Sequence, residues 1–576
     1  MNPPPESPFG TLQQITQANQ ALIDNFLRDL PTSGLGNLAG VMQALTAGGP
    51  AQVDKLRVLE ERLYRQQLTL WQQLLGGTPD AVPAADSAGD RRFDAPEWRE
   101  LPFFRYLHQA YRLNAQFLIE LGEIAELDPR TRRRLQFLLR QFSDAIAPTN
   151  FAATNPEVIR LAAQSHGESL AQGMKLMAGD VARGRISMTD EAAFEVGRNL
   201  AVTPGSVVLE NAVMQLIQYA PATAQVHARP LLIVPPFINK YYILDLQPEN
   251  SFVRYCTEQG FTTFIVSWRN IPPELGHLGW DDYIEQGVLA PIEAACSITG
   301  AEKINALGFC VGGTLLATAL SVLSGRNLEP VASLTLLASL LDFSETGDIS
   351  VYVDADFVEQ AERDFQSGGV MPGNRLATTF ATLRANDLIW HFVINNYLKG
   401  REPKAFDLLF WNADGSNLPG RLYAWYLRNM YLENSLRIPG KLILCDVPAD
   451  LGAVNVPAYV MAAREDHIVP WQSAYLSTEL LGGKCEFVLA ASGHVAGVVN
   501  PASGGRRHFW TRAETPPGPD AWLEGAAQQH GSWWPHWTKW LRSEAGELQP
   551  APAAAGNTAY PVIEPAPGRY VKQKIA

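Results

Sequence analysis

The stretch Gly308-Phe-Cys-Val-Gly-Gly313 decides the interpretation of this sequence. It follows a short apolar run at residues 304–307 and precedes a helix-like run at 314–323. A strand, a tight glycine turn and a helix form the setting in which hydrolase-type enzymes hold a nucleophile at a strained backbone position. Cysteine stands here where the lipase-type Gly-x-Ser-x-Gly pattern has serine. We therefore interpret Cys310 as a catalytic nucleophile rather than as a buried structural thiol, which most lone cysteines are.

The same turn predicts how a negative charge would be stabilised beside Cys310. The start of a helix favours the thiolate through the helix dipole and its free N–H groups. The N–H of Val311, the residue after the nucleophile, is expected to be one oxyanion donor. A second donor is expected from the loop after an early strand, where Pro235 and Pro236 have no N–H. Phe237 and Ile238 are the nearest candidates, and we assign this role to Ile238.

Short apolar runs around this turn predict a parallel sheet. Most are continuously apolar rather than alternating, as is typical of strands that are buried on both faces. Helix-like segments at 281–297 and 313–323 separate them and give a strand–helix rhythm. We expect strands near residues 230–234, 261–267, 304–307, 334–337, 458–462 and 485–489. The fold class predicted is α/β, with an α/β-hydrolase catalytic domain.

Two later residues stand where this fold needs an acid and a histidine, in that order after the nucleophile. Asp466 directly follows the expected strand 458–462, and His494 follows the strand 485–489 in a glycine-containing loop. The 28 residues between them leave room for one helix and one strand. We expect Asp466 to fix the tautomer of His494 and to stabilise its protonated form.

Other side chains compete for these two roles. Glu465 could replace Asp466, although only one of two successive residues can face the histidine. His467 is adjacent to Asp466 and is expected to point elsewhere. Three of the remaining histidines after Cys310 are interpreted as core or rim residues: His391, His530 and His536.

Composition restricts the function classes. The 576 residues include 46 Lys and Arg against 59 Asp and Glu, so the net charge of −13 argues against nucleic-acid binding. The five cysteines form no paired framework, which indicates free thiols in a reducing compartment. We see no signal peptide at the N-terminus and no apolar run of transmembrane length, and we expect a cytoplasmic protein without a metal or cofactor site.

The chain is expected to have three parts. Helical spacing dominates residues 11–76 and 96–146 and continues through 156–179 and 189–200, and a loop or linker is expected at 77–89. We therefore predict a helical N-terminal domain at 1–200 and the catalytic domain at 201–545. An aromatic-rich segment at about 342–448 breaks the strand–helix rhythm and is predicted to be an inserted cap. The Pro- and Ala-rich residues 546–576 are predicted to form a flexible tail.

With these residues in place, the chain resembles class I polyhydroxyalkanoate synthases, which include the poly-3-hydroxybutyrate synthases. The resemblance spans about residues 95–545. Its landmarks are Pro148-Thr-Asn-Phe-Ala-Ala-Thr-Asn-Pro156, Pro235-Pro-Phe-Ile-Asn-Lys-Tyr-Tyr-Ile-Leu-Asp-Leu246, Val266-Ser-Trp-Arg-Asn270, Gly308-Phe-Cys-Val-Gly-Gly313, Trp411-Asn-Ala-Asp-Gly-Ser-Asn-Leu-Pro419, Trp425-Tyr-Leu-Arg-Asn429 and Gly493-His-Val-Ala-Gly-Val-Val-Asn-Pro501.

The resemblance implies an acyltransferase that polymerises (R)-3-hydroxyacyl-CoA, chiefly 3-hydroxybutyryl-CoA, into polyester and releases CoA, with CoA as part of the substrate rather than a cofactor. A cysteine suits this reaction, because a thioester on Cys310 keeps the acyl group activated until a hydroxyl accepts it. His494 would deprotonate Cys310. Asp466, directly or through His494, would assist the attacking 3-hydroxyl. Lys240 and Arg464 are candidate contacts for the CoA phosphates.

The resemblance also implies partners: the growing polyester chain, the granule surface, phasins and a second copy of the chain in a homodimer. Two rival functions remain open. A Cys-dependent acyl-CoA thioesterase or hydrolase of the same fold would admit water to the acyl-enzyme. A non-catalytic granule-coating protein would use the same scaffold without releasing CoA.

Overall fold

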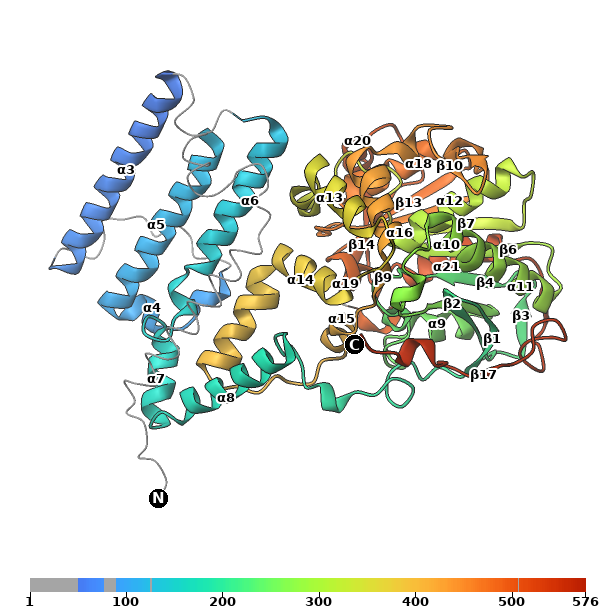
Figure 1. Ribbon diagram of the computed structural model, residues 1–576, viewed down its shortest axis with the longest axis horizontal. Coiled ribbons are helices and arrows are strands. Elements are labelled where there is room, and N and C mark those ends of the chain that lie inside the picture. Colours follow the sequence, from blue (N-terminus) through green and yellow to red (C-terminus); the bar gives the residue numbers. More distant parts are fainter. Residues whose placement is uncertain (1–49, 77–89, 125–126, 506, 576) are drawn as a thin grey trace. The chain divides into compact units, whose positions relative to one another are not determined.

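The computed structural model describes residues 50–76, 90–124, 127–505 and 507–575 (Figure 1). The chain divides into two compact units, one formed by residues up to 190 together with 380–404, and the other by 191–379 together with 405–576. The helix expected within residues 11–49 and the linker expected at 77–89 lie outside the described residues.

The first unit is helical. Its core is formed by Leu59 from one helix, Leu121 from a second, and Leu135 and Leu139 from a third, at the three- and four-residue steps of amphipathic helices. Asp128 caps the start of the third helix. Its side chain accepts hydrogen bonds from two backbone N–H groups that have no partner within the helix. The helices are α3 (Pro50–Leu74), α4 (Glu97–Glu100), α5 (Pro102–Ile124), α6 (Pro129–Ala145), α7 (Pro156–Gln164) and α8 (Glu168–Arg183).

Two expectations about the helical part are wrong. Residues 189–200 hold only a short 3-10 turn, Glu191–Ala193, because the chain then turns at Gly197 with a φ of +90°. The expected cap at 342–448 is divided between the units, since residues 380–404 belong to the helical one. Their apolar side chains Trp390 and Tyr397 are buried in one cluster with Ala145 of α6, which accounts for this placement.

The second unit is built on an eleven-stranded sheet in the order β15-β14-β13-β12-β7-β6-β4-β5-β2-β1-β17. The pairs from β5 through β4, β6, β7 and β12 to β13 are parallel, and the flanking pairs are antiparallel. The strands are β1 (Gly205–Glu210), β2 (Met214–Tyr219), β4 (Leu231–Val234), β5 (Thr263–Trp268), β6 (Ile304–Phe309), β7 (Val331–Leu337), β12 (Ala458–Ala463), β13 (Cys485–Ala490), β14 (His508–Thr511), β15 (Ala527–His530) and β17 (Glu564–Pro565).

The six expected strands are confirmed as the parallel centre of this sheet. Short two-stranded ribbons join β3 (Gln225–His227) to β16 (Leu548–Pro550), β8 (Val370–Met371) to β9 (Leu418–Pro419), and β10 (Ile443–Leu444) to β11 (Val447–Pro448). The helices are α9 (Phe252–Glu258), α10 (Trp280–Ile284), α11 (Ala290–Thr299), α12 (Val311–Gly325), α13 (Ala355–Phe365), α14 (Gly373–Leu383, which crosses the unit boundary), α15 (Asp407–Ala413), α16 (Gly420–Tyr426), α17 (Trp471–Tyr475), α18 (Ser477–Leu480), α19 (His494–Val498), α20 (Pro519–Glu524) and α21 (Trp534–Ser543).

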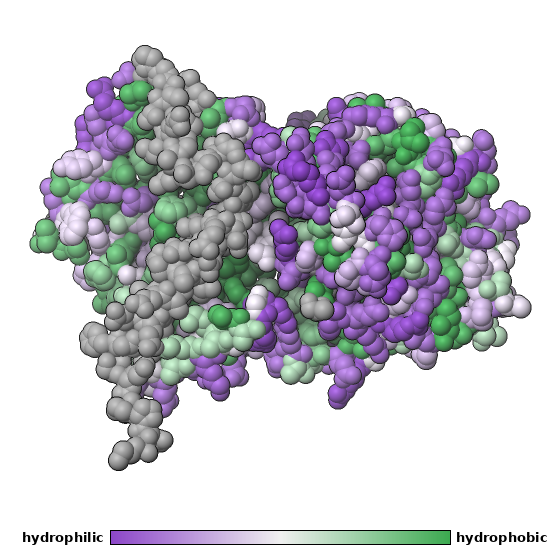
Figure 2. Space-filling view, in the orientation of Figure 1, coloured by the Kyte–Doolittle hydropathy of each residue, from purple (hydrophilic) through white to green (hydrophobic). Residues whose placement is uncertain are grey.

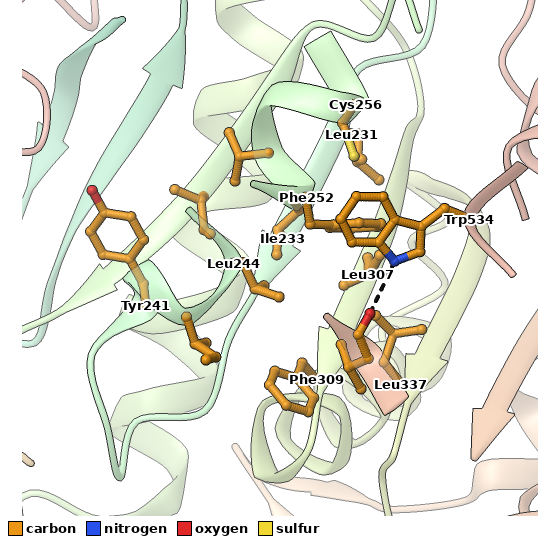
Figure 3. Packing of buried hydrophobic residues seen from close by; sticks show 14 of the residues in the cluster. Leu231, Ile233, Tyr241, Leu244, Phe252, Cys256, Leu307, Phe309, Leu337 and Trp534 are labelled. Atoms are coloured by element: carbon orange, nitrogen blue, oxygen red, sulfur yellow. Dashed lines mark hydrogen bonds between the residues drawn. The ribbon is translucent and has the colours of Figure 1, made fainter. Parts of the chain in front are cut away.

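The main hydrophobic core lies on the face of the sheet that α9 and α21 cover. Figure 3 shows Phe252 of α9 beside Trp534 of α21, above strand residues such as Leu307 and Leu337. The indole nitrogen of Trp534 donates a hydrogen bond of 3.0 Å to the carbonyl of Val498, at the end of α19. This bond ties the helix that carries His494 to the core.

The C-terminal residues are folded onto the second unit, contrary to the expected flexible tail. Strand β16 pairs with β3, and β17 pairs with β1 at an edge of the large sheet. Tyr570 is buried, and its hydroxyl donates a hydrogen bond of 2.9 Å to the carbonyl of Asn211. This segment is held in place by pairing with strands that are distant in the sequence. Its local Pro- and Ala-rich composition carries no sign of that pairing and therefore predicted a tail.

Figure 2 shows that the visible face of the second unit is mostly hydrophilic, with scattered apolar side chains. In the part of the chain that the structure describes, no helix combines the length and the apolar character needed to cross a membrane.

Candidate active site

Cys310 lies in a sharp turn at the carboxyl end of β6, directly before α12. Its backbone has a φ of +54° and a ψ of −131°, a conformation that non-glycine residues rarely adopt and that costs free energy. The backbone N–H of Cys310 donates a hydrogen bond of 2.9 Å to the carbonyl of Leu337 in β7, which holds the turn in place. The side chain is only half-buried and therefore has access to a substrate.

The glycines around Cys310 are required by close contacts. A Cβ on Gly308 would lie 2.3 Å from the Cα of Gly313, and a Cβ on Gly313 would lie 2.1 Å from the Oγ of Ser339. A Cβ on Gly312 would lie 2.3 Å from the carbonyl oxygen of Val234 and 2.6 Å from that of Pro235. All of these separations are far shorter than van der Waals contact. The glycines that predicted the turn are therefore also required for the turn to pack against its neighbours.

We expect Gly312→Ala to lower the free energy of unfolding by about 3 kcal/mol, because the backbone of the loop after β4 would have to move. Denaturant unfolding of the full chain measures this change. Gly504→Ala is the matched control, since its added Cβ would meet nothing within 4 Å, and its effect should stay within about 0.5 kcal/mol. Equal stability of the two variants would contradict the close approach of the loop to α12.

His494 and Asp466 come together as the sequence predicted. The Oδ2 atom of Asp466 accepts a hydrogen bond of 2.6 Å from the Nδ1 atom of His494, and its Oδ1 atom accepts bonds of 2.9 Å from the N–H groups of Ile468 and Val469. Because the carboxylate only accepts, Nδ1 carries the proton and Nε2 is left for Cys310. The imidazole also stacks on Phe309, with ring centroids 5.5 Å apart.

The surroundings of His494 favour its protonated form. Complete burial alone lowers the pKa of His494, but the negative charges of Asp466 and Cys310, together with hydrogen bonds to both, raise that pKa well above its ordinary value. A histidine with this pKa retains a proton taken from a neighbouring thiol. His494 is therefore suited to accept the thiol proton of Cys310.

The competing side chains lie elsewhere. Glu465 is exposed, and Asp466 is the residue that accepts the hydrogen bond from His494. The carbonyl of His467 lies against Gly347. His508 and His530 face each other across β14 and β15, and His536 contacts Tyr459 and Glu486. His391 belongs to the helical unit. The sequence-based choice among these residues agrees with the geometry.

The loop after β4 lies beside the nucleophile turn, as expected for a second oxyanion donor. Gly312 packs against its start, and the indole of Trp268 donates a hydrogen bond of 2.8 Å to the carbonyl of Pro235. The side chain of Phe237 is buried, and the carbonyl of Ile238 accepts a bond of 3.1 Å from the N–H of Ser416. Val311 is the first residue of α12, where a backbone N–H has no partner within the helix.

Lys240 and Arg464, the two candidate contacts for the CoA phosphates, differ in how accessible they are. Lys240 is 2% exposed, and its Nζ atom donates a hydrogen bond of 2.8 Å to the carbonyl of Gln573, so the expected phosphate contact is wrong for this residue. Arg464 is exposed and lies over the ring of Trp510, with its guanidinium carbon 4.7 Å from the centroid.

Two tyrosines that the sequence pattern did not single out lie close enough to Cys310 for its charge to affect them. Burial and the charges of Tyr431 and Cys310 raise the pKa of Tyr426 well above its ordinary value. Burial and the charges of Cys310, Tyr423 and Asp466 raise the pKa of Tyr431. The two rings lie 5.5 Å apart and both pack edge-on against Phe343. The only sequence signal was that Tyr426 falls within the stretch 425–429.

The other cysteines lie in settings that do not favour a thiolate. Burial raises the pKa of Cys256, Cys296 and Cys485. Burial and the neighbouring acidic groups Asp281 and Glu285 raise the pKa of Cys445 to about 12. Cys310 is therefore the cysteine whose surroundings suit nucleophilic chemistry.

Comparison with known proteins identifies two families and several relatives that are similar to this chain. The family described as the N-terminus of poly-beta-hydroxybutyrate polymerase (PhaC) matches residues 89–256, and the α/β-hydrolase fold family matches residues 229–501. The poly(3-hydroxyalkanoate) polymerase subunit PhaC of Cupriavidus necator is 52% identical over 94% of this chain and 91% of its own length. The PhaC subunit of Rhizobium etli is 41% identical over 85% of this chain and 78% of its own length. Poly(3-hydroxyalkanoate) polymerase 1 of Ectopseudomonas oleovorans is 40% identical over 87% and 89%, respectively.

Proposed function

The chain belongs to the poly(3-hydroxyalkanoate) polymerases, which are acyltransferases, and we propose that it joins short (R)-3-hydroxyacyl units, chiefly 3-hydroxybutyryl, through a thioester on Cys310. The family assignment confirms the resemblance to class I polyhydroxyalkanoate synthases and the α/β-hydrolase fold of the catalytic part. The observation that carries the proposal is the hydrogen bond between Asp466 and His494 beside a half-buried Cys310 at a strained turn.

Loading of the enzyme would begin with attack of the Cys310 thiolate on the thioester carbonyl of the substrate. The N–H groups of Val311 and Ile238 would stabilise the oxyanion that forms. When the carbonyl reforms, the bond to the CoA sulfur breaks, and the imidazolium of His494 gives its proton to the departing CoA thiolate. The acyl group is then held as a thioester, and neutral His494 remains bonded to Asp466.

Elongation would use that neutral imidazole as a base. The 3-hydroxyl of a second hydroxyacyl group attacks the carbonyl on Cys310, and His494, oriented by Asp466, accepts the hydroxyl proton. An ester bond forms as the bond to the Cys310 sulfur breaks, which restores the thiolate–imidazolium pair. Asp466 acts through His494 here, because its Oδ1 atom is occupied by two backbone N–H groups and its Oδ2 atom by the imidazole.

Aromatic side chains beside Cys310 support the preference for short acyl groups. Tyr426, Tyr431 and Phe343 form one contiguous cluster, and the charge of Cys310 reaches both tyrosines. Aromatic rings at this place would exclude water from the thioester and would limit the room for a long acyl chain. The exclusion of water favours a polymerase over a thioesterase.

We also propose that the enzyme is cytoplasmic, works on the surface of the polyester granule, contacts phasins and acts as a homodimer. Exposed apolar side chains of the helical unit support a surface-binding role, since Tyr64 and Trp71 of α3, and Leu75 directly after it, are each at least half exposed.

Incubation of the purified chain with (R)-3-hydroxybutyryl-CoA tests the proposed function. We expect CoA release together with insoluble polyester, and we expect the protein to pellet with that polymer. We expect the kcat/KM for CoA release to be at least about tenfold higher with 3-hydroxybutyryl-CoA than with 3-hydroxyoctanoyl-CoA, because the longer chain must displace these aromatic rings. Free 3-hydroxybutyrate as the sole product would instead identify a hydrolase. Polymer without CoA release from wild-type protein would contradict the chemistry.

A further inference from the structure

Lys240 is a buried amine that the reaction scheme does not use. It lies in the loop after β4, two residues beyond Ile238, and is 2% exposed. Its Nζ atom donates a hydrogen bond of 2.8 Å to the main-chain carbonyl of Gln573, only three residues before the last residue of the sequence. Burial lowers the pKa of Lys240 to about 8, although the charge of Asp414 opposes that shift. A buried amine needs such partners to remain in place.

The next residue of the C-terminal segment makes a second contact, with a buried carboxylate. Lys574 forms an ion pair with Asp414, at 3.0 Å between Nζ and Oδ1. The Asp414 side chain is 4% exposed, and its Oδ2 atom accepts a hydrogen bond of 2.9 Å from the hydroxyl of Tyr242. The carbonyl of Lys574 accepts a further bond of 3.0 Å from the side chain of Asn270, in the loop after β5.

The segments held by Gln573 and Lys574 also bind each other. The carbonyl of Ile238 accepts a hydrogen bond of 3.1 Å from Ser416, and the carbonyl of Lys240 accepts one of 2.7 Å from the indole of Trp411. Asn239 between them forms an isolated bridge with Gly415. Residues 238–240 are therefore fixed by segment 411–416 and by the C-terminal residues together.

This arrangement bears on catalysis because the loop after β4 begins at the nucleophile turn. The carbonyl oxygens of Val234 and Pro235 lie so close to Gly312 that no Cβ fits between them. An oxyanion donor acts only when its N–H is held in place before the charge develops. A displacement of residues 238–240 would misplace that donor without moving Cys310 or His494.

We propose that Gln573 and Lys574 form a C-terminal latch, a positioning device that holds the 238–240 loop where its N–H can meet the oxyanion. The latch rests on the proposed function, because the oxyanion arises only when Cys310 is acylated. Its residues contact Lys240, Asn270 and Asp414 rather than the thiol. They act through the loop.

Two rates measured on the full-length chain separate this role from a merely structural one. Acylation of Cys310 by (R)-3-hydroxybutyryl-CoA, followed as the first turnover of CoA release, passes through an oxyanion. Alkylation of Cys310 by iodoacetamide depends on the thiolate but forms no oxyanion. We expect Lys240→Met and Lys574→Met to slow acylation about tenfold or more and to leave alkylation within about twofold of wild type.

Matched variants complete the test. Lys574→Arg retains the charge opposite Asp414 and should restore acylation, because the Lys574 side chain is 61% exposed and leaves room for a guanidinium. Lys572→Met alters a lysine of the same segment that lies beside Gly197 instead, and it should match wild type. If Lys240→Met fails to fold, Lys574→Met still carries the measurement.

If the wild type releases CoA and the folded variants Lys240→Met and Lys574→Met are acylated at an unchanged rate, the latch is overturned. An equal loss of acylation and alkylation would also overturn it, because the effect would then be general damage to the site. Failure of the wild-type protein itself to release CoA would refute the proposed function.

Discussion

Cys310→Ala is expected to abolish CoA release from (R)-3-hydroxybutyryl-CoA, with a loss of at least about 10⁴-fold in kcat. Without the sulfur there is no atom to carry the acyl group, and His494 cannot replace it. Cys310→Ser should also lose several orders of magnitude, because a serine would form an oxoester and forfeit the activation that drives transfer to a hydroxyl. Steady-state CoA release, measured with a thiol reagent on folded protein, gives both values.

Cys296→Ala is the matched control for that experiment. Cys296 is also half-buried, but it lies in α11, and burial raises the pKa of its thiol. This variant should retain wild-type kcat within about twofold. CoA release by Cys310→Ala at a rate near that of Cys296→Ala would refute the assignment of the nucleophile.

His494→Gln should reduce kcat about 10³-fold or more, the second largest effect that we expect. Glutamine can still donate a hydrogen bond to Asp466, but it can neither take the proton of Cys310 nor return one to the departing CoA. His530→Gln, an exposed position on the edge strand β15, is the control and should leave kcat unchanged. Equal rates for the two variants would remove His494 from the mechanism.

The pH dependence of the alkylation of Cys310 by iodoacetamide tests whether His494 accepts the thiol proton. Burial lowers the pKa of His494, yet the charges of Asp466 and Cys310 raise it well above 6.5 overall, so the imidazolium persists as pH rises through neutrality. Alkylation of wild-type Cys310 should therefore depend less steeply on pH than alkylation of a variant that lacks this base. In His494→Gln, the rate should increase nearly tenfold per pH unit towards the range near 8.5 where an unassisted thiol ionises. A steep profile in the wild type would contradict the ion pair.

The sequence predicted the centre of the site because the determining constraints there are local. Gly308, Gly312 and Gly313 are required by contacts within and beside one turn, and Cys310 takes its strained φ from that turn. Asp466 and His494 follow strands that are buried on both faces, so each has a clear apolar run before it. Parallel strands then bring their carboxyl ends to one edge.

The parts that the sequence did not predict depend on distant partners. Strand β17 pairs with β1, across more than 300 residues of chain, and its Pro- and Ala-rich surroundings indicated a tail. The sequence suggested Lys240 as a contact for the CoA phosphates, but its amine donates a hydrogen bond to the carbonyl of Gln573. Residues 380–404 have the helical spacing of a cap, but their aromatic side chains pack in the helical unit. In each case, packing between remote segments outweighs the local pattern.

Mass analysis of the peptide that contains Cys310, after brief exposure of the enzyme to (R)-3-hydroxybutyryl-CoA and acid quenching, tests the central claim most directly. We predict one or more 3-hydroxybutyryl groups on this cysteine, removable by neutral hydroxylamine as a thioester is. An unmodified Cys310 in a sample that is actively making polymer, or an acyl group found on another residue, would contradict the account.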